Sequence, residues 1–240
     1  MKPDYSRKST VDEIRERFDN DVERFSNLDT GQQTTIDAPL TMDLCTEAAK
    51  YVNPNAKDLL DIGCGAGNYT LKMLRKINDL NCTLVDLSMP MLERAQSRVS
   101  AETKGTVKII QQDMRDLDFP EESFDAIFAA ATFHHLRDDA DWENVFKKMY
   151  RFLKPGGSIW ISDLITHGNQ QLKQLFEDRY AAYLDSIGGP GYRKKVLDYV
   201  EYEDTPRSLI YQLDLLRKTG FKEVEILHKN SSMAAFGAIK

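Results

Sequence analysis

Hydrophobic and polar positions change their pattern at Asp58 and again after Asp163. Between these points, short apolar runs alternate with longer segments in which apolar residues recur at helical spacing. The apolar runs predict strands at Asp58–Ile62, Cys82–Asp86, Val107–Ile110, Asp125–Ala131 and Ser158–Asp163. The segments between them predict helices at about Tyr69–Ile77, Met89–Val99 and Trp142–Phe152. Apolar strands that are each followed by a helix indicate a parallel sheet covered on both faces, a doubly wound α/β domain.

Two helices are predicted before the first strand. Thr10 and Glu13 have the spacing of a capping box, and apolar residues then recur from Val11 to Phe25, so we expect one amphipathic helix there. The segment Asn27–Thr35 is polar and turn-rich. A second helix is predicted to begin at Asp37, with a proline in its first turn.

The pattern after Asp163 predicts a helical, tyrosine-rich insertion to about Glu203, interrupted by the flexible sequence 188–191. Its aromatic stripe has two open interpretations, a packing face or a lid over a substrate. The final segments predict one helix and an antiparallel hairpin, at Thr205–Thr219, Glu223–His228 and Met233–Ile239.

Composition supports one folded, acidic domain spanning 1–240. The 240 residues are 41% hydrophobic, and 32 Lys and Arg against 38 Asp and Glu give a net charge of −6. Such a balance argues against a general nucleic-acid or anionic-membrane binder, although a local basic patch stays open. The cysteines Cys45, Cys64 and Cys82 form no paired motif, and no signal peptide or membrane-spanning run is present. We therefore expect a soluble cytoplasmic protein with reduced thiols.

The most informative motif is Leu59–Thr70, where an apolar strand runs into Asp61 and then Gly63, Gly65 and Gly67 before a helix. Such a turn lies at the carboxyl edge of the sheet, where ligands of open α/β sheets bind. The spacing G-x-G-x-G lacks the last glycine of a dinucleotide fingerprint. The Asp61 carboxylate would also repel a pyrophosphate by on the order of 4 kcal/mol. The loop therefore favours a cationic ligand, such as one with an ammonium and a sulfonium, over the alternative of a tight turn alone.

Acidic residues after the next two strands extend this interpretation. Asp86 lies where an acid about 20 residues beyond the loop can accept hydrogen bonds from both ribose hydroxyls, which indicates a nucleoside. After the third strand, Asp113 could accept from an adenine amino group and Met114 could pack on the ring. Two alternatives stay open, Asp113 as a helix cap and Met114 as a core residue.

In this order, the motifs resemble those of the class I S-adenosylmethionine-dependent methyltransferases. The resemblance covers roughly residues 57–163 and implies a Rossmann-like, seven-stranded, mostly parallel sheet with an antiparallel C-terminal hairpin. It also implies S-adenosyl-L-methionine as the cofactor and methyl transfer to a small-molecule acceptor. The cofactor-binding residues that it implies are Asp61, Gly63, Cys64, Gly65, Gly67, Asp86, Leu87, Asp113, Met114 and Ala130. We expect Cys64 to be a small neutral residue with backbone contacts to the ligand.

The part from Tyr192 onward resembles the carboxy-S-adenosylmethionine synthases of tRNA wobble-uridine modification, which implies a second hypothesis, a cofactor-modifying enzyme. The chain departs from that group at three places. Lys194 stands where the group has an Arg, Ala130 replaces an Asn, and the group's ligand-contacting Tyr falls near Asp37. A third hypothesis is a non-catalytic cofactor-binding partner protein.

In methyl transfer from a sulfonium, alignment of donor and acceptor can lower the activation barrier by roughly 7–11 kcal/mol, whereas a general base lowers it by about 3–5 kcal/mol. If the acceptor must lose a proton, His134 after the fourth strand is the predicted general base. The alternative is that His134 belongs to a turn with only a structural role. The spacing of His, Cys and acidic residues predicts no metal site. The segments 1–56 and 164–203 predict a helical cap over the acceptor. The acceptor's identity and a homodimeric state stay open.

Overall fold

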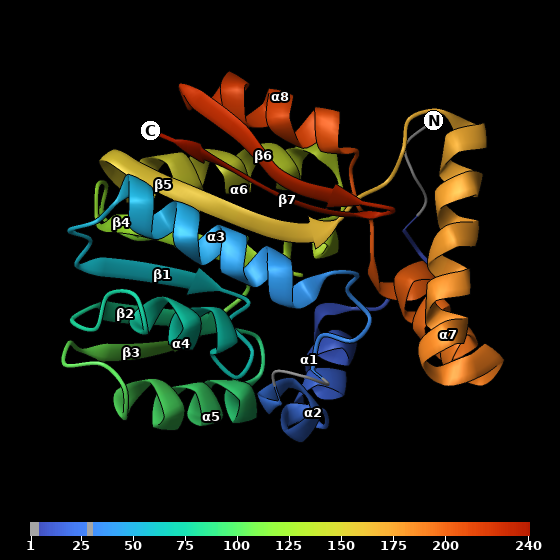
Figure 1. Cartoon of the computed structure of the whole chain (residues 1–240), viewed down its shortest axis with the longest axis horizontal. Helices are drawn as coiled ribbons and strands as arrows, with labels where there is room; N and C mark the ends of the chain where they lie inside the picture. Colours follow the sequence, from blue (N-terminus) through green and yellow to red (C-terminus); the bar gives the residue numbers. More distant parts are fainter. Residues whose placement is uncertain (1–4, 28–30) are drawn as a thin grey trace.

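In the computed structural model, which describes residues 5–27 and 31–240, seven strands form one sheet with the order β3-β2-β1-β4-β5-β7-β6 (Figure 1). Strands β1 to β5 run parallel, and β7 lies antiparallel between β5 and β6. The strands are β1 (Asp58–Ile62), β2 (Asn81–Asp86), β3 (Val107–Gln111), β4 (Phe124–Ala130), β5 (Leu153–Leu164), β6 (Glu223–Asn230) and β7 (Met233–Ile239). The predicted fold class is confirmed, including the closing hairpin.

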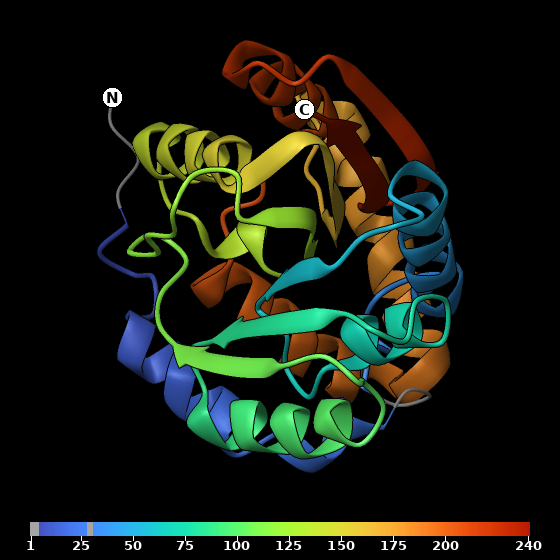
Figure 2. The ribbon, with the colours of Figure 1, turned by 90° about the vertical axis from the view of Figure 1, so that its left-hand side faces the viewer.

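Helices cover both faces of this sheet, as Figures 1 and 2 show. Helices α3, α4 and α5 lie on one face, and α6 and α8 lie on the other. The helices are α1 (Val11–Asp19), α2 (Val22–Ser26), α3 (Ala38–Val52), α4 (Asn68–Leu74), α5 (Met89–Ser100), α6 (Asp139–Phe152), α7 (Gln170–Glu203) and α8 (Leu209–Thr219), with a 3-10 turn η1 (Phe133–His135) after β4.

Two hydrophobic cores explain why the central strands carry apolar residues at consecutive positions. Leu60 of β1 packs with Trp142 and Phe146 of α6 on one face. Its neighbour Leu59 packs with Met73 of α4 on the other face. All five side chains are at most 1% exposed. Since neighbouring residues of a strand point to opposite faces, a sheet covered twice needs apolar residues throughout.

The single N-terminal helix predicted for Val11–Phe25 is wrong. The capping box of Thr10 is present, but α1 ends at Asp19 and α2 begins only at Val22. Asn20 interrupts the helix because its short polar side chain competes for backbone hydrogen bonds, and its amide donates to Glu16 O at 2.7 Å. The next residue, Asp21, pairs with the Arg24 side chain. Of the predicted turn-rich segment 27–35, residues 28–30 lie outside the described residues, and residues 31–37 form turns or bends.

The predicted start of the last helix, Thr205, is also wrong. Helix α8 begins at Leu209, after the N-cap Ser208, whose hydroxyl accepts from Tyr211 N. The residues before it have another role, since Thr205 N donates to His134 O at 2.7 Å. This bond ties the segment after α7 to the turn after β4.

Helix α7 lies beyond the carboxyl ends of β1 and β5, next to α1 and α2 (Figure 1). It bends at Gly189, whose backbone angles of φ 74° and ψ −178° are accessible in practice only to glycine. Tyr180 and Leu184 of its first half pack against a small third core. The aromatic stripe is therefore partly a packing face. None of the described helices combines the length and apolar character that crossing a bilayer requires.

Candidate functional site

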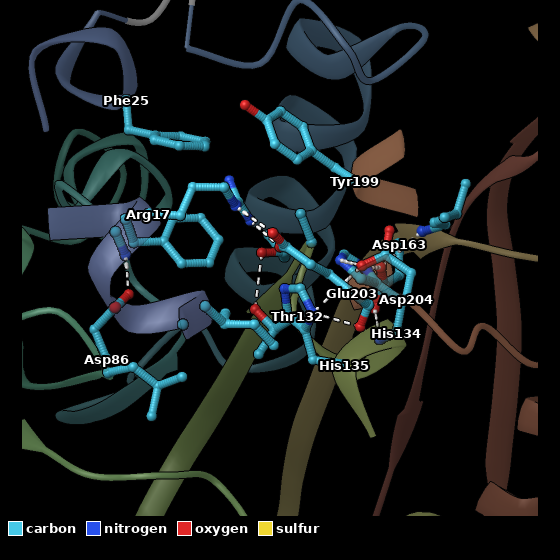
Figure 3. Close-up of a pocket in the computed structure, with 18 of the residues that line it drawn as sticks. Arg17, Phe25, Asp86, Thr132, His134, His135, Asp163, Tyr199, Glu203 and Asp204 are labelled. Carbon is cyan, nitrogen blue, oxygen red and sulfur yellow. Dashed lines mark hydrogen bonds and ion pairs between the residues drawn. The ribbon is translucent and has the colours of Figure 1, made fainter. Parts of the chain in front are cut away.

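A cavity of about 490 Å³ lies at the carboxyl ends of the parallel strands, between their loops and helices α1, α2 and α7 (Figure 3). We call the strand loops its floor and the three helices its roof. The predicted residues that line it are Asp61, Gly63, Cys64, Gly65, Asp86, Leu87, Asp113, Met114, Ala130 and His134. Gly67 does not line it. The parallel sheet thus brings the four predicted motifs to one edge.

Backbone geometry explains the three glycines of the loop. A Cβ added at Gly63, where φ is +63°, would lie 2.2 Å from Thr132 Oγ1, so this position has no room for a side chain. A Cβ at Gly65, where φ is +50°, would meet nothing within 4 Å. Gly67 faces Ala95 and Val99 of α5 instead. Gly63 and Gly67 therefore shape the loop, and Gly65 leaves its surface open to the cavity.

The Asp86 carboxylate holds this loop in place. Its Oδ2 accepts from Gly65 N at 2.8 Å and its Oδ1 from Ser88 N at 3.0 Å. Burial raises the pKa of Asp86, and backbone hydrogen bonds from Ser88, Gly65 and Leu87 oppose this effect. A carboxylate can accept about four hydrogen bonds, so Asp86 retains acceptor capacity on the cavity side.

Asp61, the acid of the glycine loop, is buried, with 2% of its surface exposed. The Thr70 hydroxyl donates to Asp61 Oδ2 at 2.6 Å. Burial raises the pKa of Asp61 to about 7, and the nearby charge of Asp86 contributes to the increase. Asp61 is therefore only partly ionised at neutral pH, and a cation bound beside it would favour its ionised form.

Asp113 already has a partner in the structure. Its Oδ1 accepts from the backbone N–H of Arg115 at 2.8 Å, and its two oxygens pair with the Arg115 guanidinium at 2.9 and 2.6 Å. Burial opposes ionisation, but the Arg115 bonds outweigh it and lower the pKa of Asp113. Residues 114–116 form a turn and no helix begins there, so the helix-cap alternative is wrong, and an adenine contact stays a prediction. Met114 both lines the cavity and packs against the core.

The turn η1 places His134 and His135 on the floor, beside two acids from other parts of the chain (Figure 3). His134 Nδ1 pairs with Asp163 Oδ1 at the end of β5, and its Nε2 lies 3.6 Å from Asp204 Oδ1. Burial opposes protonation of His134, but Asp163 and Asp204 outweigh it and raise its pKa to about 9. A protonated imidazole cannot accept a further proton. The predicted base role stays a prediction, and this geometry favours a charged partner of the two acids.

An ion pair joins two helices of the roof, α1 and the end of α7. Arg17 of α1 donates through Nε to Glu203 Oε1 at 2.7 Å and through Nη2 to Oε2. The same guanidinium lies over the rings of Phe18, at 4.1 Å, and Tyr199, at 4.8 Å. The Glu203 side chain is 7% exposed. Helices α1 and α7 are therefore linked directly above the His134–His135 turn.

Sequence reasoning missed the acids and the cation on this side of the cavity. Asp163 ends β5 at the same edge as Asp61 and Asp86, so the topology rule that found those two could have found it. Arg17, Glu203 and Asp204 carry no sequence signal, because only tertiary packing brings α1 and the end of α7 to the strand ends.

The residues compared with the carboxy-S-adenosylmethionine synthases lie elsewhere. The Lys194 side chain is 77% exposed and pairs with Asp198 outside the cavity, whereas its neighbour Lys195 lines the cavity. Asp37 accepts from Asn230 and pairs with His228, and it does not line the cavity. Neither Lys194 nor Asp37 is placed to contact a ligand there.

Comparison with known proteins agrees with the motif order. Residues 59–157 match the family model described as a methyltransferase domain. A carboxy-S-adenosyl-L-methionine synthase from Shewanella woodyi is 29% identical over 200 residues, which cover 80% of this chain and 79% of that protein. A demethylmenaquinone methyltransferase from Listeria monocytogenes is 25% identical over 182 residues, which cover 74% of this chain and 75% of that protein.

A solved structure shares the whole fold. The 1,6-didemethyltoxoflavin-N1-methyltransferase of Burkholderia thailandensis superposes with a TM-score of 0.64 at 16% identity, covering 97% of this chain and 91% of that chain. Some matching structures are longer, and the chain spans only 57% of one of them. The family match and the two relatives support the resemblance to the class I S-adenosylmethionine-dependent methyltransferases, and the solved structure shows that this chain shares the fold of one such enzyme.

Proposed function

We propose that this methyltransferase modifies a small molecule that binds between the glycine loop and the roof. The observation that supports this proposal is the continuity of the cavity, which runs from Asp86 to Tyr199 and is covered by α1, α2 and α7. These helices lie outside the matched residues 59–157. A volume of about 490 Å³ is typical of small-molecule sites, and a roof of three helices favours such an acceptor over a polymer.

The residues of the glycine-loop side fit S-adenosylmethionine, which supplies a methyl group activated by a sulfonium when it is bound. The open surface at Gly65 allows a ligand to approach the backbone. Asp86 has spare acceptor capacity for two ribose hydroxyls, and Asp61 is a buried carboxylate for the methionine ammonium. Leu87 and Met114 supply apolar surface beside them.

The acceptor side combines aromatic walls with a few polar groups. Phe25 and Tyr199 of the roof lie on the opposite side of the cavity from His135 and Asp204 (Figure 3). The Phe18 ring of α1 lies edge-on to His135, with the ring centroids 6.1 Å apart. Flat apolar surfaces suit a planar acceptor, and the floor groups would orient its polar atom. We propose on this basis that α1, α2 and α7 act as the substrate cap, whereas α3, which also belongs to the predicted cap segment 1–56, packs on a face of the sheet.

A carboxy-S-adenosylmethionine synthase activity is the second candidate. It is supported by the 29% identical relative and by Lys195, a cation on the cavity wall. Mass spectrometry of the nucleoside retained by purified protein separates the two candidates. A mass greater than that of S-adenosylmethionine by one carboxyl group would favour the synthase, and S-adenosylhomocysteine would favour methyl transfer.

The acceptor side can be tested with two tyrosines of α7. Tyr199 lines the cavity, whereas Tyr202 is 49% exposed and does not. With an acceptor found by S-adenosylhomocysteine release from a panel of small molecules, Tyr199→Ala should raise the acceptor KM about tenfold. Tyr202→Ala should leave it unchanged, and neither variant should alter cofactor affinity. Release only with a macromolecular acceptor, or equal effects of the two variants, would contradict the proposal.

A further inference from the structure

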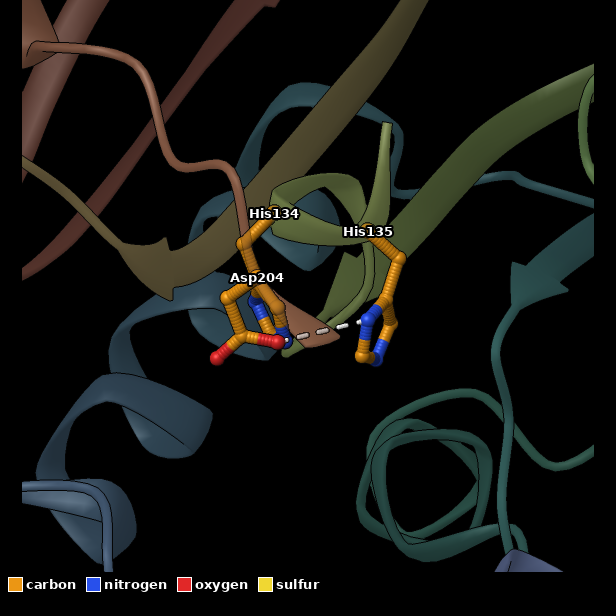
Figure 4. A group of neighbouring side chains, drawn as sticks. All are labelled: His134, His135 and Asp204. Atoms are coloured by element: carbon orange, nitrogen blue, oxygen red, sulfur yellow. Dashed lines mark ion pairs between the residues drawn. The ribbon is translucent and has the colours of Figure 1, made fainter. Parts of the chain in front are cut away.

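Three side chains with metal-binding atoms converge on the floor of the cavity (Figure 4). His134 and His135 come from η1, and Asp204 follows the last residue of α7. His134 Nε2, His135 Nδ1 and one Asp204 oxygen lie within 4.8 Å of one another, and all three residues line the cavity. We propose that His134, His135 and Asp204 bind a divalent first-row transition-metal ion.

The distances in this cluster suit ligands of a shared ion better than hydrogen-bonded partners. Asp204 Oδ1 lies 3.6 Å from His134 Nε2 and 3.4 Å from His135 Nδ1. Both distances exceed the usual upper limit of about 3.2 Å for an N–H···O hydrogen bond. Ligand atoms that each lie about 2.1 Å from a tetrahedral ion are about 3.4 Å apart. The two distances to Asp204 therefore match the edges of a coordination tetrahedron, and all three ligand atoms lie within 4.8 Å of one another.

Asp163 supplies the outer contact that histidine ligands of metals usually have. It accepts a hydrogen bond from His134 Nδ1, which leaves Nε2, on the Asp204 side of the ring, as the nitrogen that could bind an ion. Asp163 is itself held by the backbone N–H groups of Leu164, at 2.7 Å, and His134, at 3.2 Å. The first ligand is thus oriented before any ion binds.

The charges of the site also favour a divalent cation. Asp163 is buried beside His134, and the Asp204 side chain, which lies near both imidazoles, is only 9% exposed. An ion of charge +2 would replace the proton on His134 and balance both carboxylates. The nearby cations Lys8 and Arg137 donate to backbone carbonyls, those of Asp204 and Glu203. These two cations therefore do not replace a partner for the carboxylates.

Two imidazoles and one carboxylate form a donor set that suits Zn²⁺, Fe²⁺, Co²⁺ or Ni²⁺ and leaves coordination positions open. Since the three residues line the cavity, an oxygen of the acceptor could take an open position. That last step rests on the proposed function, whereas ion binding does not. Sequence spacing concealed the site because His135 and Asp204 are 69 positions apart.

Co²⁺ is the direct probe, because its visible absorption reports the coordination number. We expect one Co²⁺ per full-length chain and displacement of it by Zn²⁺. His135→Ala and Asp204→Asn should lower the Zn²⁺ affinity at least 100-fold, and Asp163→Asn about 10- to 100-fold. The matched control is His228→Gln, because His228 pairs with Asp37 outside the cavity and should leave the affinity unchanged.

S-adenosylhomocysteine affinity, measured on the same samples, verifies that each variant is folded. The metal site would be overturned if Co²⁺ did not bind stoichiometrically, or if the His228→Gln variant lost as much affinity as the others. The three residues would then form only a buried ion-pair group. If methyl transfer proceeds in a chain that binds no ion, the metal site fails and the proposed function stands. If the ion binds but no acceptor is methylated, the failure is that of the proposed function.

Discussion

The buried carboxylate of Asp61 leads to a sharp prediction about cofactor affinity. Its pKa of about 7 means that half of the chains carry a protonated Asp61 at pH 7. A protonated carboxyl group cannot form an ion pair with the ammonium of the cofactor. Affinity should therefore fall as the pH drops below 7, and Asp61→Asn should remove this part of the pH dependence.

The size of the effect follows from the fraction of ionised Asp61. With a pKa of about 7, that fraction is one half at pH 7 and about 3% at pH 5.5. If only the ionised form binds, the affinity falls about 16-fold over this range, or about 1.6 kcal/mol. The α-amino group of the ligand stays protonated throughout, so it adds little to the change.

Calorimetric titration with S-adenosylhomocysteine at pH 5.5, 6.2 and 7 measures this dependence. Burial also raises the pKa of Asp86, so the Asp61→Asn variant is the control, and its remaining slope reports the other groups. We expect the wild-type slope to exceed that of the variant by the factor above. Parallel slopes in the two proteins would refute the assignment of this titration to Asp61.

The same shift predicts a change in stability. The pKa of Asp61 is higher in the folded chain than its ordinary value of 3.8, so its contribution to stability is complete below about pH 4 and is lost as the pH rises through 7. The difference corresponds to at most about 4 kcal/mol. Urea unfolding without ligand should show Asp61→Asn to be more stable than wild type at pH 8, with the gap closing toward pH 4. A constant gap would contradict the linkage.

Further predictions concern the loop and the roof. Gly63→Ala should lower the midpoint of thermal unfolding strongly because the added methyl group clashes with Thr132. Gly65→Ala should fold and lose cofactor affinity at least tenfold. Equal midpoints of the two variants in thermal unfolding would contradict this contrast. Arg17→Met should lower the free energy of unfolding by about 3 kcal/mol, because Glu203 is left buried without its partner. Adding Glu203→Gln should restore at least 1 kcal/mol in chemical denaturation, and no restoration would refute the buried-charge explanation.

Local chemistry was enough to predict most of the fold. The strands of the parallel sheet are apolar on both faces, and β7 matched its predicted range at both ends. The two wrong helix boundaries occurred where another interaction outweighed the helical spacing of the apolar residues. Asn20 broke a helix whose apolar spacing continued across it, and the residues before Ser208 form tertiary contacts instead of a first helical turn.

The sequence by itself determined the glycine-loop side of the cavity, because the motifs there follow consecutive parallel strands and all parallel strands end at one edge. Gly65, Asp86 and Asp113 meet there for that reason. Only the tertiary structure decided the acceptor side, where the first helix and the end of α7 fold over the strand ends. The approach of Arg17 to Glu203, and of Asp204 to the histidine turn, spans long stretches of chain and depends on helix packing, which leaves no periodic signal in the sequence.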